Sequence, residues 1–190
     1  EISMSNWAST FMEKGLMLPK LAGDLLAMCG FAVMLGIGRT IYGFFGTKLR
    51  IQRVTMLGAL LAFLCYIVAA LSPVDAINIA ACALCGLAVS LLWPGTIIIA
   101  SEHYPMAGAW MFAILAAFGD IGGAIGPWIT GEAVDWLLTS PWIQQFSTAM
   151  NLPVEQASLR GGLLLAAVFP LLAFLCHAVL LRLKRNSTGH

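Results

Sequence analysis

Long stretches without a charged side chain dominate the 190-residue chain and alternate with short polar connections. Between Arg53 and Asp75 lie 21 residues without Asp, Glu, Lys or Arg, and between Asp75 and Glu102 there are 26. A third stretch of 21 residues separates Arg160 from Arg182. Each is long enough for the ~20 residues that a helix needs to cross the hydrocarbon core of a bilayer. The pattern therefore predicts three membrane-spanning helices here.

Two further apolar stretches carry one internal charge each. Residues 25–46 are interrupted by Arg39, and residues 104–131 by Asp120. Both are also long enough to span a bilayer. Including a partial helix at the start, the expected helices cover 1–14, 21–46, 54–73, 76–101, 105–131 and 161–182.

The first apolar segment is too short to cross a membrane. Residues 1–12 precede the charged pair Glu13 and Lys14 and the helix breaker Gly15. A helix of that length reaches only ~18 Å. We therefore expect this segment to be the last part of a truncated sixth helix, and the chain to be a fragment.

The composition excludes an ordinary soluble domain. Hydrophobic residues make up 60% of the chain, charged residues 10%, and the mean hydropathy is +0.89. Soluble domains contain roughly 25% charged residues. The formal net charge of +1 argues against nucleic-acid binding driven by bulk charge. These values predict an all-α integral membrane protein.

Basic residues gather in the connections of one side, which the positive-inside rule assigns to the cytoplasm. If the helices alternate in direction, that side holds Lys48, Arg50, Arg53, Arg182, Lys184 and Arg185, against Lys14, Lys20 and Arg160 on the other. The C-terminus is then cytoplasmic, and we expect a multi-pass protein of the plasma (inner) membrane. The longest connection, residues 132–159, contains Trp136, Trp142 and Phe146 and predicts a short interfacial helix.

Small residues and prolines predict how the helices pack and bend. Gly119 with Gly123, and Gly122 with Gly126, form two overlapping GxxxG pairs, a pattern that lets helices in lipid approach closely. Pro127 follows directly and is expected to bend the outer end of that helix. A Trp-Pro-Gly sequence at residues 93–95 is expected to interrupt the helix over 76–101.

Charges inside the membrane cost roughly 2.5–3.5 kcal/mol each at mid-depth, so each one needs an explanation. Glu1 and Asp120 are expected ~18 Å and ~21 Å from the ends of their helices, where both could face a central cavity. Desolvation disfavours the charged form of a buried carboxylic acid, so such a group can bind and release protons near neutral pH. Asp120 could instead bond neighbouring helices. Arg39 lies nearer the cytoplasmic face, where a long side chain can extend to water in a structural role.

A sugar-binding role is one interpretation of the residues above Glu1. Asn6 offers an amide for hydroxyl groups, and Trp7 offers a ring for the apolar face of a pyranose. Packing in the core is the other interpretation of Trp7. Trp93 is a candidate gate at the interrupted helix. The sequence contains no H-E-x-x-H, no G-x-S-x-G and no metal-ligand spacing, so it predicts no enzyme, no cofactor and no metal site.

Three segments resemble parts of the major facilitator superfamily of transporters. The superfamily's G-x-x-x-D-R-x-G cytoplasmic motif between helices 8 and 9 resembles residues 38–50 (GRTIYGFFGTKLR). Its helix 10 is similar to 92–105 (LWPGTIIIASEHYP), and its helix 11 to 122–131 (GGAIGPWITG). The chain thus resembles the C-terminal six-helix half over 1–190, with its 3+3 inverted repeat. The resemblance implies gating roles for Gly38, Arg39, Gly43, Lys48 and Arg50, although Thr47 stands where the motif has Asp, and Arg50 where it has Gly.

Within the superfamily, residues 1–7 and 152–162 look most like the fucose-permease-like sugar:proton symporters. The resemblance implies proton-coupled uptake of a small polar solute such as a sugar by alternating access. The implied partners are a small-molecule substrate, a proton, the lipid bilayer and an N-terminal half. Two alternatives stay open: an antiporter or efflux member, and a non-transporting six-helix module that dimerises. Glu1, Asn6, Trp7, Trp93 and Asp120 are the predicted contacts for substrate or proton.

Overall fold

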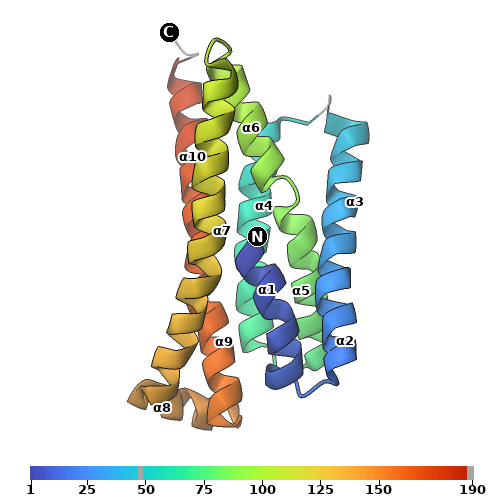
Figure 1. The fold of residues 1–190 in the computed structure, drawn as a ribbon, viewed down its shortest axis with the longest axis vertical. Helices are drawn as coiled ribbons and strands as arrows, with labels where there is room; N and C mark the ends of the chain where they lie inside the picture. Colours follow the sequence, from blue (N-terminus) through green and yellow to red (C-terminus); the bar gives the residue numbers. More distant parts are fainter. Residues whose placement is uncertain (47–48, 188–190) are drawn as a thin grey trace.

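The computed structural model describes residues 1–46 and 49–187, and in these residues it contains helices and connecting turns but no strand. The chain begins with α1 (Ile2–Thr10), which continues into a π-helical turn, η1 (Phe11–Gly15). The other elements are α2 (Lys20–Asp24), η2 (Leu25–Cys29), α3 (Gly30–Phe45), α4 (Ile51–Leu71), α5 (Asp75–Val89), α6 (Leu92–His103), α7 (Gly108–Thr139), α8 (Pro141–Met150), α9 (Val154–Ala166) and α10 (Val168–Ser187). Figure 1 shows most of them standing side by side as a bundle.

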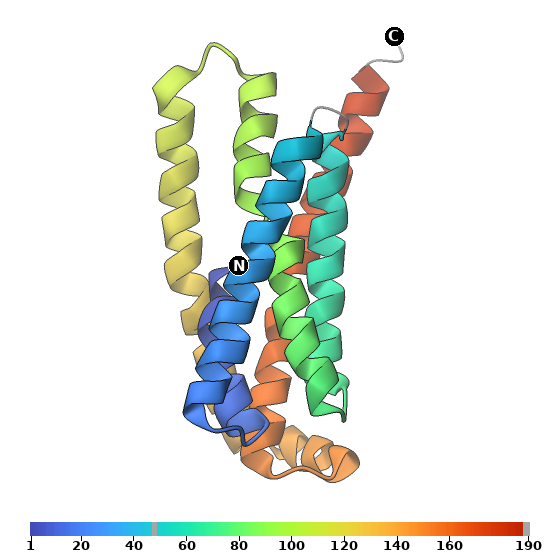
Figure 2. The same ribbon diagram turned by 90° about the vertical axis from the view of Figure 1, so that its right-hand side faces the viewer.

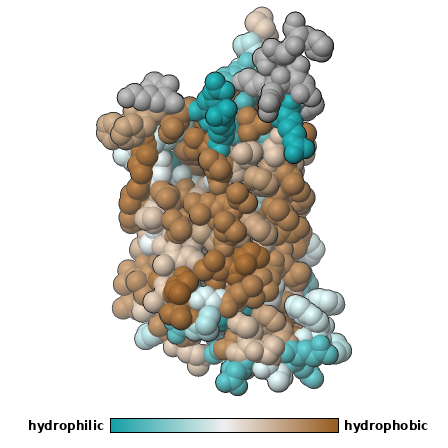
Figure 3. All heavy atoms as spheres, turned by 180° about the vertical axis from the view of Figure 1, so that it is seen from behind, coloured by the Kyte–Doolittle hydropathy of each residue, from teal (hydrophilic) through white to brown (hydrophobic). Residues whose placement is uncertain are grey.

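Within the described residues, five helical segments are long and apolar enough to cross a membrane, which confirms the five predicted spans. They are Lys20–Phe45, Ile51–Leu71, Asp75–His103, Gly108–Thr139 and Val154–Arg182. Apolar side chains cover the long middle of the face seen in Figure 3, while polar ones gather toward its two ends. Such a surface suits a multi-pass membrane protein, because only the ends meet water.

Two helices are longer than the charge pattern predicts. α7 continues past 131 to Thr139, so Trp136 lies in this helix and not in the connection. α9 begins at Val154 and not at 161. The charged residues Glu132 and Asp135 do not end α7, whereas Pro141 does. Ser140 is extended (φ −83°, ψ 135°) because Pro141 follows it, and α7 ends there.

The predicted interfacial helix is α8, which lies across the end of the bundle in Figure 1. The ring of Trp142 stacks on Phe146, with centroids 5.7 Å apart. On its inner side Ile143 is fully buried and packs with Leu137 and Ala157. α8 thus holds the ends of α7 and α9 together.

α4 is central to the bundle and packs against α5, α6, α9 and α10. Its core positions are mostly small, as at Ala59, Ala62 and Ala69, each fully buried. Small residues also let α5 approach its neighbours: a Cβ added at Gly86 would overlap the carbonyl of Phe31 on α3. Figure 2 shows α3, α4 and α5 side by side. Close helix packing of this kind is typical of membrane bundles.

Candidate functional site

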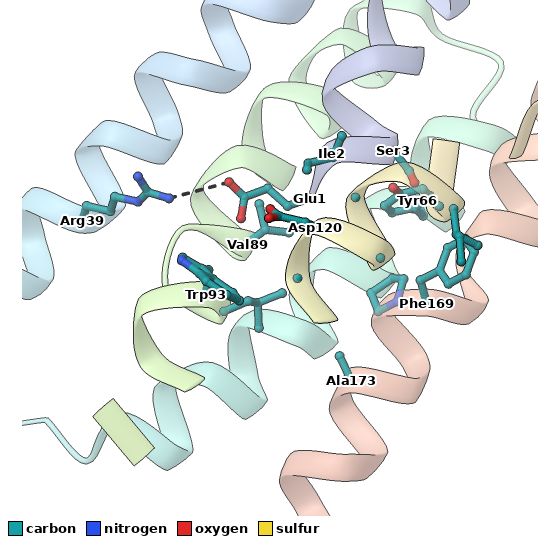
Figure 4. A pocket seen from close by; sticks show the side chains of 17 residues that line it. Glu1, Ile2, Ser3, Arg39, Tyr66, Val89, Trp93, Asp120, Phe169 and Ala173 are labelled. Atoms are coloured by element: carbon teal, nitrogen blue, oxygen red, sulfur yellow. Dashed lines mark ion pairs between the residues drawn. The ribbon is translucent and has the colours of Figure 1, made fainter. Parts of the chain in front are cut away.

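A cavity of about 700 Å³ lies at mid-height in the bundle, near the beginning of α1. Its walls come from α1, α3, α4, α5, α6, α7 and α10. The charged residues that line it are Glu1, Arg39 and Asp120, and the aromatic ones are Tyr66, Trp93 and Phe169. Figure 4 shows Glu1, Asp120 and Trp93 around one space between the helices. The structure therefore brings together three of the five predicted contacts for substrate or proton.

Two interrupted helices border this cavity. α5 and α6 are separated at Ser90 and Leu91, directly before the predicted Trp-Pro-Gly sequence. The reason is that Pro94 has no N–H to donate to the carbonyl of Ser90, four residues earlier. Pro170 stands in the same relation to Ala166, at the break between α9 and α10. Interrupted helices at membrane depth are usual where backbone lines a polar cavity.

Arg39 connects three elements at the first of these breaks. Its Nε donates a hydrogen bond to the freed carbonyl of Ser90 (3.2 Å). Its Nη2 lies 3.6 Å from Oε1 of Glu1, forming an ion pair. The prediction that Arg39 extends toward the cytoplasmic face is wrong, because the side chain finds an acceptor and a counter-charge at the cavity. One guanidinium thus joins α1, α3 and the α5–α6 break.

Gly38 allows α3 to approach that break. A Cβ added there would lie 2.7 Å from Cβ of Ser90, closer than real Cβ contacts allow. The hydroxyl of Ser90 itself donates to the carbonyl of Leu87 (2.7 Å) and so cannot easily turn away. Gly38 therefore sets the position from which Arg39 reaches Ser90.

We expect Gly38→Ala to lower the free energy of unfolding by about 1–3 kcal/mol, the usual cost of overpacking. Gly43→Ala on the same helix is the matched control, since nothing lies within 4 Å of a Cβ added at Gly43. The control should be neutral or more stable by about 0.5–1 kcal/mol, because alanine favours a helix. Thermal unfolding in detergent measures both. Equal melting temperatures for the two variants would contradict the close contact.

Three glycines of α7 face side chains and not the backbone of another helix. Cβ atoms added at Gly119, Gly123 and Gly126 would lie 2.7, 2.6 and 2.7 Å from side-chain atoms of Trp93, Ile2 and Ser3, in that order. A Cβ at Gly122 would have nothing within 4 Å. The glycine series therefore makes room for α1 and for Trp93, and leaves one open position on the cavity wall.

Asn6 and Trp7 do not line the cavity. The indole N–H of Trp7 donates to the carbonyl of Pro127 (3.2 Å), so this side chain ties α1 to α7. Asn6 is exposed. α7 continues through Pro127 as one helix. Packing is thus the interpretation of Trp7 that its position supports.

The five residues of the resembled cytoplasmic motif do not gather at one place. Arg39 lines the cavity, and Gly38 packs against Ser90 at the α5–α6 break, whereas Gly43 is exposed in α3. Arg50 is exposed at the beginning of α4. Lys48 lies outside the described residues. The structure therefore places Arg39 at the cavity, Gly38 at the neighbouring helix break, and Gly43 and Arg50 at exposed positions.

Sequence reasoning placed Arg160 in a polar connection, but it is a buried residue of α9 with 2% of its surface exposed. Its Nη1 donates to the carbonyl of Ser72 (2.6 Å), and its guanidinium lies 6.0 Å from the ring centroid of Phe11. A smaller cavity of about 300 Å³, which Asp75 also lines, adjoins it. Pro153 ahead of α9 was the available signal that a helix begins there.

No group of three or more His, Cys, Asp or Glu side chains that could hold a metal ion occurs in residues 1–46 and 49–187. The chain matches no protein-family model, no curated protein and no solved structure in the comparisons made. The resemblance to the major facilitator superfamily thus stays a prediction. The functional proposal rests on the cavity and the residues that line it.

Proposed function

We propose that the chain is part of a secondary active transporter that couples the movement of a small solute to protons, with the central cavity as the solute pathway. One observation carries this proposal: Glu1, Arg39 and Asp120 line a single cavity at mid-height, bordered by two interrupted helices. Ionisable residues inside membrane segments mark ion and substrate pathways more often than other sites. Interrupted helices at the midplane are typical binding elements of transporters.

The sequence resemblance supports the same reading. A C-terminal half of the major facilitator type needs an N-terminal half to complete the cavity, and alternating access follows from rocking of the two halves. The basic residues that follow α3 and those near the end of α10 support a cytoplasmic C-terminus in the plasma (inner) membrane. On this proposal α3, α6, α7 and α10 line the pathway from one side.

The two carboxylates have different surroundings, which suggests different roles. Glu1 is held by Arg39, so a proton on Glu1 removes the ion pair and leaves Arg39 bound to Ser90 alone. Asp120 has neither an ion pair nor a hydrogen bond among the described residues, and it is exposed to the cavity. We assign proton binding to Asp120, and to Glu1 and Arg39 the coupling of charge to the α5–α6 break.

A sugar substrate was expected partly from Asn6 and Trp7, which lie away from the cavity. The proposal of transport does not depend on them.

Proton-coupled transport is tested by reconstituting the intact protein in liposomes and imposing a pH gradient across the membrane. Addition of a transported solute should change the internal pH, and a protonophore should abolish solute accumulation. Solute movement that ignores the pH gradient for every solute taken up would contradict proton coupling.

A further inference from the structure

The cavity contains one carboxylate without a counter-charge. Glu1 and Arg39 neutralise each other, whereas Asp120 has no ion-pair partner among the described residues. Its lining neighbours on α7 include Gly119, Gly122 and Gly123, which have no side chains to donate a hydrogen bond. With both acids ionised, the two carboxylates and one guanidinium among the lining side chains sum to a formal side-chain charge of −1. A bound cation would give Asp120 the counter-charge that it lacks.

An aromatic ring lines the same cavity as this carboxylate. The indole of Trp93 lies against Gly119, the residue before Asp120, and 40% of Trp93 is exposed. Figure 4 shows Trp93 beside the cavity that Asp120 also faces. The face of tryptophan attracts cations more strongly than that of any other side chain. Asp120 and Trp93 therefore offer a carboxylate and a ring to one positive group.

The other residues that line the cavity suit a ligand that is largely apolar. The uncharged hydrogen-bonding side chains among the described lining residues are Ser3, Tyr66 and Trp93. Apart from Glu1, Arg39 and Asp120, the remaining side chains are aliphatic or aromatic, among them Val89, Leu92, Ile125 and Phe169. A polyhydroxylated solute would leave many of its hydroxyl groups without partners on this wall, and each unpaired buried group is costly. An apolar solute body has no such cost.

We infer that the cavity binds an organic monocation, in which an ammonium or phosphonium group is attached to an apolar body, with the positive charge held by Asp120 and Trp93. A volume of about 700 Å³ is in the range of small-molecule sites. This inference rests on the proposed function for the use of the site, because it names the solute class that the transporter would take. The binding itself can be measured without transport.

Binding of radiolabelled tetraphenylphosphonium to the purified intact protein in detergent tests the inference by equilibrium dialysis. We expect saturable binding that Asp120→Asn weakens at least tenfold, because one full charge pair is lost. Trp93→Leu should weaken it several-fold. Glu132→Gln and Trp128→Leu are matched controls on α7, since neither residue lines the cavity, and both should bind as the unmodified protein does. Triphenylphosphine oxide, a neutral compound with a similar aryl body, should compete weakly.

Equal binding of tetraphenylphosphonium to the Asp120→Asn variant would overturn the inference, as would competition by the neutral oxide at the same concentration as unlabelled tetraphenylphosphonium. These outcomes are separate from a failure of the proposed function. Proton-coupled uptake of a neutral solute without phosphonium binding would overturn the cation site and leave transport standing. Asp120-dependent binding without any translocation would support the cation site and contradict transport.

Discussion

Asp120→Asn is expected to abolish the pH dependence of solute uptake while leaving the amount of folded protein unchanged. Asparagine has nearly the same shape as aspartate, and Asp120 makes no hydrogen bond or ion pair that the change would break among the described residues. An amide cannot bind a proton in the physiological range. Uptake at saturating solute should therefore fall, and the part that remains should be the same at every pH.

The measurement is initial uptake by the intact protein in vesicles between about pH 5 and pH 8. The other charged or titratable groups that line the cavity, Glu1, Arg39 and Tyr66, are unchanged in this variant. Glu132→Gln removes a carboxylate from the same helix outside the cavity and should retain the original profile. A pH profile unaltered by Asp120→Asn would rule out the proton-binding role.

The second large effect is expected for Arg39→Leu. The variant leaves the carbonyl of Ser90 without a donor and Glu1 without a counter-charge. An acceptor left unpaired costs about 1–3 kcal/mol when buried. The ion pair adds less, about 0.2–1 kcal/mol, since its two side chains are 48% and 30% exposed. We therefore expect the free energy of unfolding to fall chiefly through the loss of the bond to Ser90.

A double-mutant cycle separates the two contributions. Glu1→Gln alone removes the ion pair and keeps the bond to Ser90, so its effect should be the smaller one. Combined with Arg39→Leu, it gives the coupling energy of the pair. Arg53→Leu on α4, also exposed, is the control for loss of a surface arginine and should change stability by no more than about 0.5 kcal/mol. A coupling energy as large as the whole effect of Arg39→Leu would contradict this expectation. It would mean that the ion pair, and not the hydrogen bond to Ser90, provides most of the stabilisation.

The membrane spans were predictable because the bilayer sets a strict requirement. A helix must contain ~20 apolar residues to cross, and charges are rare enough in this chain to show where each stretch lies. The ends of helices were less predictable from charge. Glu132 and Asp135 lie inside α7, whereas Pro141 ends it through the conformation of Ser140. Pro141 and Pro153 were better signals for the end of α7 and the beginning of α9.

The direction of Arg39 could not be predicted from its distance to the end of the helix. Its partners are a residue 38 positions earlier and a carbonyl 51 positions later, which only the packing of α1, α3 and α5 brings together. The proline rule identifies the freed carbonyl of Ser90, four residues before Pro94, but not the donor that reaches it. Long-range pairs of this kind depend on the tertiary structure.

The position of Asn6 and Trp7 did have a signal in the sequence. Successive residues turn by about 100° around a helix, so Asn6 is displaced about 140° from Glu1 and Trp7 about 120° in the other direction. Neither side chain can share the face of Glu1. Glu1 and Asp120, which were expected at similar depth, do line one cavity, but depth alone does not select the residues that face it.

On the proposed function, the cavity beside Asp120 forms part of a pathway open to water on alternate sides of the membrane. Gly122→Cys tests it directly, because a Cβ at this position meets nothing within 4 Å and so the substitution should fit. The exposed Cys29 and Cys176 are first replaced by serine, while the buried Cys65, Cys82 and Cys85 are kept. A membrane-impermeant thiol reagent is then added to sealed vesicles from one side or the other. We predict that Gly122→Cys is labelled from both sides and that a transported solute slows the labelling. Failure of the reagent to label this cysteine from one of the two sides would contradict the pathway.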